Sequence, residues 1–172
     1  MIIPPEYNIS ATKVTGEIAF FWIIFYSLLT FFFLNLKIYN PYSGFQVVAW
    51  IFVGSAIGAI SGMMYTKNQL RRLSKDHLIY PNGKDIILFI VPILILVLPS
   101  FFISWFVYGA LIRGLALLGL LISVFAFGIS EQVVKYLLFH VYEKKENMRL
   151  MQSLFESGIV VIPKAPNRSF TA

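Results

Sequence analysis

Four long apolar runs dominate the sequence and restrict the chain to folds that use lipid as a solvent. The first, residues 18–36, is rich in aromatic side chains and contains no charge. A helix needs about 20 apolar residues to cross the hydrocarbon core of a bilayer. The runs therefore predict an all-α integral membrane protein with four transmembrane helices in two hairpins, at about 17–36, 45–65, 86–108 and 114–130.

Composition agrees with a chain that resides in lipid. Of the 172 residues, 58% are hydrophobic and 13% are charged, whereas a soluble domain is about 45–50% apolar. The absence of cysteine excludes disulfides, thiolate metal sites and cysteine nucleophiles. The segment 1–16 lacks the features of a cleavable signal, so we expect it to form an N-terminal cytoplasmic segment before a retained first span.

Polar segments separate the apolar runs. Residues 40–44 have the composition of a turn, and 109–114 form a very short connection. Residues 66–85 contain five cations and a Pro-Asn-Gly turn signal, and we interpret them as the one substantial internal loop. Pro92 and Pro99 favour a kink in the third helix, and a re-entrant third segment is the main alternative to a full span.

The fourth helix is expected to continue beyond the membrane. No glycine or proline occurs between residues 130 and 157, and apolar residues recur there at roughly helical spacing. This stripe contains Val134, Leu137, Leu138, Val141, Met148, Met151 and Phe155. We therefore expect a transmembrane domain over 17–142 with a helical continuation, and a cytoplasmic amphipathic extension with an irregular tail over 143–172.

The distribution of cations predicts the orientation. With a cytoplasmic N-terminus, twelve of the 14 lysines and arginines lie on the inner side, and only Lys37 and Arg113 lie outside. Inner loops of membrane proteins carry an excess of such residues. The count predicts an inner or plasma membrane location with both termini in the cytoplasm. An odd number of spans would put one of the two strongly basic segments on the outer side.

Small residues mark two helix surfaces. Gly54, Gly58 and Gly62 share one face of the second helix, and the fourth helix contains Gly119 and Ser123. Small residues allow the backbones of two membrane helices to approach closely. We predict that helices two and four form a close pair, while contact with another subunit through the same glycines stays open.

Ionisable residues are scarce inside the apolar runs, so Glu131 and Lys135 near the end of the fourth run are the main candidates. Acid and base are four residues apart in the order that favours an intrahelical ion pair, and the alternative is an ion or proton relay through Glu131. The two histidines, His77 and His140, do not suggest a haem or metal site. We predict no cofactor and no metal.

The internal loop offers a basic surface made of Lys67, Arg71, Arg72 and Lys75. These cations sit among leucines and are candidates for docking lipid headgroups or a protein partner, although membrane orientation alone also explains them. The net charge of +6 is too dispersed to predict nucleic-acid binding.

The sequence contains no catalytic or nucleotide-binding motif, so we do not expect an enzyme. The first hypothesis is a non-catalytic membrane subunit or accessory protein that packs into a larger complex, with the lipid bilayer and other membrane subunits, or a second copy, as partners. The alternative is a small oligomeric transporter or channel with Glu131 on the ion path. An enzyme acting on lipid has only the basic loop for support.

Overall fold

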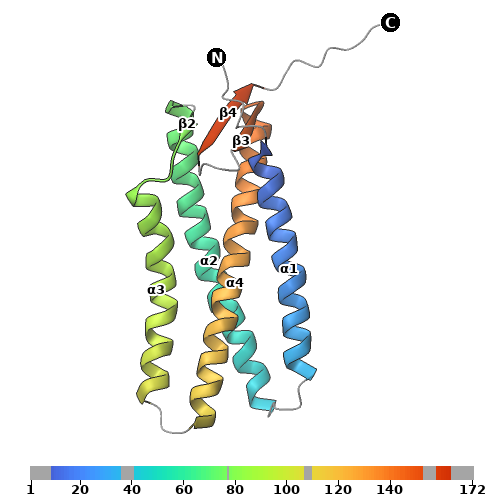
Figure 1. The fold of residues 1–172 in the computed structure, drawn as a ribbon, viewed down its shortest axis with the longest axis vertical. Coiled ribbons are helices and arrows are strands. Elements are labelled where there is room, and N and C mark those ends of the chain that lie inside the picture. The colour runs from blue at the N-terminus through green and yellow to red at the C-terminus, as the bar shows by residue number, and fades with distance from the viewer. Residues whose placement is uncertain (1–8, 36–40, 77, 107–109, 153–157, 164–172) are drawn as a thin grey trace, which may run out of the picture.

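The computed structural model describes residues 9–35, 41–76, 78–106, 110–152 and 158–163, and within them the chain is mostly helical. The four helices in these ranges are α1 (Ala11–Asn35), α2 (Pro41–Asp76), α3 (Gly83–Phe106) and α4 (Ala110–Lys145). They lie side by side and alternate in direction, and short strands cover one end of the bundle (Figure 1). We call this the capped end.

The helices differ in length. α2 and α4 contain 36 residues each, which makes them about 54 Å long, whereas the hydrocarbon core of a bilayer is about 30 Å thick. α1 and α3 contain 25 and 24 residues. Two helical segments, Val48–Leu73 and Gly119–Lys145, are long and apolar enough to cross a membrane by length and composition.

The predicted internal loop is largely helical. α2 continues through the basic residues to Asp76, and the strand β2 (Leu78–Ile79) follows before α3 begins at Gly83. The physical reason is that residues 66–76 contain neither glycine nor proline, and they bury one face of the helix through Thr66, Gln69 and Leu73. The expectation of a loop was therefore wrong for this segment.

The second difference is a small antiparallel sheet at the capped end. Its strands β1 (Ile9–Ser10), β2, β3 (Met148–Gln152) and β4 (Ile159–Pro163) lie in the order β1-β3-β4-β2. The central pair runs from Met148 opposite Pro163 to Gln152 opposite Ile159. Residues 159–163, which we expected to be irregular, are thus a strand.

α4 continues past residue 130, as expected, but it ends at Lys145, before Met148 and Met151 of the predicted apolar stripe. Asn147 has a φ of 51°, in the left-handed region that commonly terminates a helix and that asparagine tolerates. The backbone N–H of Leu150 then donates to Oε1 of Glu143 at 2.7 Å, which ties the new strand to the helix end. Met148 and Met151 therefore belong to β3, and Phe155 lies outside the described residues.

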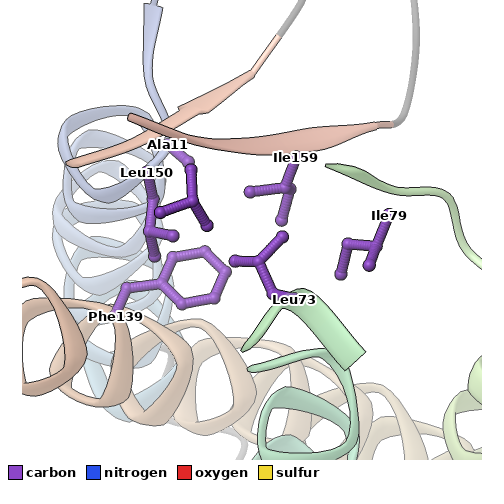
Figure 2. Close-up of a cluster of buried hydrophobic side chains, with 7 residues drawn as sticks. Ala11, Leu73, Ile79, Phe139, Leu150 and Ile159 are labelled. Carbon is purple, nitrogen blue, oxygen red and sulfur yellow. The ribbon is translucent and has the colours of Figure 1, made fainter. Parts of the chain in front are cut away.

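The sheet encloses a hydrophobic core of its own at the capped end. Figure 2 shows side chains from both terminal segments and from the helices converging beneath the strands. The core consists of Ala11, Leu73, Ile79, Phe139, Leu150, Ile159 and Val161. Because it draws on α1, α2 and α4 together with three strands, it fixes the ends of these helices relative to one another.

α4 packs against the other three helices. The rings of Trp22 on α1 and Phe125 on α4 have centroids 5.7 Å apart, and those of Phe89 on α3 and Phe127 on α4 are 6.2 Å apart. α3 is also joined to α2, since Ser61 Oγ donates to the carbonyl of Leu88 at 2.9 Å. α4 thus forms the axis of the bundle.

Candidate functional site

The small residues of α2 and α4 face each other inside the chain. A methyl group on Gly54 or Gly58 would lie less than 3.0 Å from the backbone of Ser123 or Phe127, and one on Gly62 would lie 2.9 Å from Cα of Glu131. Only glycine allows so close an approach. The glycine face of α2 is therefore covered by α4 of the same chain.

Gly119 makes a similar contact toward the opposite end of the pair. A methyl group there would lie 2.5 Å from Nε1 of Trp50 on α2. Ser123 is fully buried, and its Oγ donates to the carbonyl of Leu120 within its own helix at 2.9 Å. Both residues thus leave room for α2 beside α4, and the buried Ser123 hydroxyl keeps a hydrogen bond within its own helix.

Near the capped end, Asp85 connects α2 to the beginning of α3. This carboxylate is 1% exposed and accepts hydrogen bonds from Asn68 Nδ2 and Arg72 Nη1, both at 2.7 Å. It also accepts from the backbone N–H of Asn82 at 3.0 Å, while Asn82 Oδ1 accepts from the N–H of Asp85 at 3.0 Å. This reciprocal pair is a capping box, which satisfies two donors at the helix start.

Sequence reasoning did not identify Asp85, although the order Asn82-Gly83-Lys84-Asp85 contained the spacing of a capping box. Its partner Arg72 was predicted to dock lipid headgroups. In the structure the guanidinium binds Asp85 and also donates through Nη2 to the carbonyl of Tyr80 at 2.8 Å. Arg72 therefore holds α2 and α3 together.

A cavity of about 420 Å³ opens beside Asp85, between α2, α3 and α4. One part of its wall is polar and carries charges of both signs, and another part, from α3, is apolar. The lining residues are Tyr65, Pro81, Asp85, Ile86, Phe89, Ile90, Glu131, Gln132 and Lys135. We call this space the polar cavity.

Glu131 and Lys135 both line the polar cavity, but they do not form the predicted ion pair at contact distance. Within the described ranges, ion pairs join Lys13 to Glu17, Arg72 to Asp85 and Lys145 to Glu146. Glu131 is 4% exposed and accepts one hydrogen bond, from Nε2 of the neighbouring Gln132 at 3.2 Å. A buried carboxylate with so little compensation is costly to maintain.

The Lys135 ammonium lies over two aromatic rings. Its Nζ is 5.7 Å from the ring centroid of Tyr65 and 5.6 Å from that of Phe139, which is within the range of cation–π attraction. The hydroxyl of Tyr65 in turn accepts from Nε2 of Gln69 at 2.8 Å. The cavity thus holds a carboxylate and an ammonium on successive turns of α4, neither of which contacts an opposite charge of the protein.

A second cavity, of about 300 Å³, shares Phe89, Glu131 and Gln132 with the first. Its other walls are apolar and come from residues farther from the capped end on α1, α3 and α4. They are Trp22, Ile93, Val124, Phe125, Phe127, Gly128 and Ile129. We call this space the apolar cavity. Apart from its chain neighbours and the backbone of α4 itself, no atom would lie within 4 Å of a methyl group placed on Gly128.

The remaining predicted residues lie apart from these cavities. Lys67 and Arg71 are exposed on the capped-end part of α2, and the side chain of Lys75 lies outside the described residues, as does His77. His140 is exposed and stacks on Tyr136, with ring centroids 6.2 Å apart. Across the described ranges, no group of three or more histidine, aspartate or glutamate side chains could hold a metal ion.

The geometry gives the site a definite chemical capability. A ligand in the polar cavity would meet a hydrogen-bond acceptor with a negative charge at Glu131 and a donor with a positive charge at Lys135, next to an apolar space. Comparison of the chain with protein-family models, with curated proteins and with solved structures gives no match.

Proposed function

We propose that the chain is a four-span membrane protein that acts as a small transporter or channel and binds a charged ligand at Glu131. In this proposal α1 to α4 all cross an inner or plasma membrane, and the sheet lies in the cytoplasm together with both termini. The observation that carries the proposal is the buried Glu131 carboxylate, which lines a cavity and has no counter-ion at contact distance. Ionisable residues inside membrane proteins are costly and usually functional.

The position of Glu131 along α4 supports this role. It is 21 residues beyond Ala110, the first residue of the helix, which corresponds to about 32 Å. A hydrocarbon core of about 30 Å would therefore place Glu131 where the membrane meets the cytoplasm. A ligand bound at Glu131 would lie at the cytoplasmic end of a transport path along α3. Pro92, inside α3, removes a backbone hydrogen bond from that helix.

The cations support the orientation, because they gather at the capped end. By their place in the helices and strands, the cationic residues of the described ranges near that end are Lys13, Lys67, Arg71, Arg72, Lys75, Lys84, Lys135, Lys144, Lys145 and Arg149, whereas Arg113 lies near the start of α4 at the other end. The positive-inside tendency then assigns the capped end to the cytoplasm.

The subunit hypothesis stays a prediction, but its main sequence argument has weakened. Gly54, Gly58 and Gly62 could have received a helix of another protein, and α4 of the same chain occupies that face. Purification in a mild detergent tests it: co-purifying polypeptides in stoichiometric amounts would favour a subunit, and a homogeneous particle of this chain alone would favour the transporter.

Flux measurements test the proposed function directly. The full chain is reconstituted in liposomes, and the flux of H⁺, Na⁺, K⁺ and Cl⁻ is compared for the wild type and the Glu131→Gln variant. We expect a flux that the substitution abolishes. Glu17→Gln is the matched control, because the Glu17 side chain is 66% exposed and lies outside both cavities. Equal flux in the wild type and Glu131→Gln would refute the role of Glu131.

A further inference from the structure

A third cavity, lined by cations, opens at the capped end between α2 and the beginning of α3. Its volume is about 510 Å³, and it shares no lining residue with the polar or the apolar cavity. The lining residues are Asn68, Arg71, Arg72, Asn82, Gly83 and Lys84. We call this space the basic cavity. Three of these residues are cations and none is acidic, so the cavity favours an anionic ligand.

The positive charges of the basic cavity come from both helices. Arg72 is bound to Asp85 at 2.7 Å, while Arg71 on α2 and Lys84 in the first turn of α3 are exposed and add two further charges. The positive end of the α3 dipole lies at the same place, because the helix begins at Gly83. A phosphate has several acceptor oxygens and can therefore bind cations on two sides at once.

An apolar groove of about 340 Å³ lies between α2 and α3 on the side of the basic cavity. Met64 lines the groove one turn before Asn68 of the basic cavity, and Lys84 of the basic cavity lies one turn before Ile87 of the groove. Residues at this spacing are neighbours on one helix face, so the two spaces follow each other along the helix pair. The apolar residues of the groove include Ile57, Ile60, Met64, Ile87, Val91 and Ile95. We call this space the α2–α3 groove.

The boundary of the proposed hydrocarbon region falls between the groove and the basic cavity. The apolar run of α3 begins at Ile86, and about 20 residues cross the hydrocarbon core. Ile86 also lines the polar cavity together with Glu131, which the proposed arrangement places at the same boundary. The α2–α3 groove therefore lies in the hydrocarbon, whereas Arg71 and Lys84 lie at the level of the lipid headgroups.

We propose that the basic cavity and the α2–α3 groove together bind one anionic phospholipid of the cytoplasmic leaflet. The phosphate lies between Arg71 and Lys84, and one hydrocarbon chain runs along the groove toward the middle of the bilayer. The order of the groups in the lipid is the order of the two spaces along the helices. A headgroup with an ammonium would bring a like charge among the cations, which is unfavourable.

The groove offers the chain an apolar surface. The hydroxyl of Ser61, which also lines the groove, donates to the carbonyl of Leu88 at 2.9 Å and is thus satisfied within the protein. Ile60, Ile87 and Ile95 are more than half exposed, so a hydrocarbon chain can cover them. This inference rests on the membrane arrangement of the proposed function, but not on transport at Glu131.

Native mass spectrometry of the full chain tests the headgroup. The detergent-solubilised protein is exposed to equal amounts of phosphatidylglycerol, phosphatidylethanolamine and phosphatidylcholine with identical chains, and the retained lipids are counted. We expect phosphatidylglycerol to be retained about tenfold over each of the others. This factor corresponds to about 1.4 kcal/mol, which two cations near a membrane surface can supply. Equal retention, or a preference for either of the other two lipids, overturns the proposal.

A soluble anion distinguishes a lipid site from a phosphate site. Phosphatidylglycerol should stay bound in an excess of inorganic phosphate as well as it does in chloride at the same ionic strength, because the groove also holds its chain. Displacement by phosphate alone would show that the basic cavity binds a free anion, and the lipid assignment would be wrong.

Charge variants locate the headgroup. Arg71→Gln and Lys84→Gln should each lower the preference for phosphatidylglycerol about fivefold, which corresponds to about 1 kcal/mol for one cation. Lys144→Gln is the matched control, because it removes the same charge from an exposed position of the capped end on α4, outside both spaces. Circular dichroism verifies that each variant is folded. Equal effects of all three substitutions would mean a general attraction to the basic end and would overturn the site.

A bulky substitution locates the hydrocarbon chain. Val91→Trp fills the α2–α3 groove and should lower the retention of phosphatidylglycerol about tenfold, as expected when about two methylene groups lose their contacts. Leu94→Trp is the control on the same helix, because Leu94 is as exposed as Val91, at 44%, and does not line the groove. Unchanged retention in a folded Val91→Trp variant contradicts the placement of the chain.

The lipid and transport proposals can fail separately. If ion flux depends on Glu131 but no lipid is preferred, the transporter proposal stands and the lipid assignment is wrong. If phosphatidylglycerol is selected through Arg71 and Lys84 but no flux is observed, the lipid site stands and the transporter proposal is wrong.

Discussion

Gly58→Ala should destabilise the bundle because it separates α2 from α4. The added methyl group would lie less than 3.0 Å from Cα, C and O of Phe127, all of which belong to the backbone. Favourable carbon contacts lie at about 3.5–4.0 Å, so one helix must move away from the other by close to an ångström. Such overpacking costs about 1–3 kcal/mol.

Gly128→Ala is the matched control, because it introduces the same methyl group on α4 at a position where nothing lies within 4 Å. Replacing a glycine inside a helix by alanine contributes about 1 kcal/mol of helix propensity in water. This contribution is common to both variants whatever its size in a membrane, so it cancels in their comparison. Gly58→Ala should therefore be less stable than Gly128→Ala by about 1–3 kcal/mol.

The assay is reversible unfolding in mixed micelles, followed by circular dichroism as the fraction of denaturing detergent rises. The free energy of unfolding is compared for the wild type and the two variants at the same protein concentration. Equal stability of Gly58→Ala and Gly128→Ala would refute the close approach of α2 and α4 at Phe127, and with it the reason for glycine at this position.

Three further predictions use the same unfolding assay. Asp85→Asn should cost about 2 kcal/mol, because Arg72 loses a charge-assisted hydrogen bond, and stability equal to the wild type would show that the two helices are joined elsewhere. Leu150→Ala should lower the free energy of unfolding by about 2–5 kcal/mol, since Leu150 is fully buried. Leu137→Ala, at a position that is 52% exposed, should lower it far less. Similar losses in the two variants would contradict a hydrophobic core at the capped end. Asn147→Val should cost about 1–2 kcal/mol because its φ is 51°, while Asn147→Gly should be tolerated; an equally stable valine variant would mean that α4 ends differently.

Features with a local, periodic signal could be predicted from the sequence. Each helix coincides with one of the four apolar runs. Gly54, Gly58 and Gly62 are four residues apart, and this spacing identified the face of α2 that packs against α4. The cost of burying a charge was enough to select Glu131. These inferences depend on one segment at a time, which is why sequence patterns reach them.

The sheet could not be predicted in the same way, because its strands are short and pair over long sequence distances. β1 and β2 contain two residues each, which is too few for an alternating pattern. Met148 and Met151 lie three residues apart, so they also suit a helix. A usable signal was present in Ile159-Val160-Val161-Ile162, a β-branched run between Gly158 and Pro163.

The cavity was missed for a related reason. Tyr65, Asp85 and Glu131 come from three helices and are far apart in the sequence, so their proximity depends on how the helices pack. Lys135 illustrates the limit of spacing rules: its distance from Glu131 in the sequence predicted an ion pair, but its Nζ lies over the rings of Tyr65 and Phe139. Phe139 lies four residues after Lys135 on the same helix, so this contact agrees with helical spacing. The contact with Tyr65 of α2 cannot be inferred from one helix alone.

The pairing of the strands has a consequence for how often the chain can traverse a bilayer. β1 is bonded to β3, β3 to β4 and β4 to β2. In the proposed membrane arrangement, the segments before α1, between α2 and α3, and after α4 would therefore lie on the same side of the bilayer. The number of crossings between Ser10 and Leu78 is then even, and so is the number between Ile79 and Met148. If α4 traverses the bilayer, α3 must traverse it as well, and a re-entrant α3 is incompatible with the sheet. The fourteen residues of the four strands thus impose a parity rule that is independent of every charge in the loops.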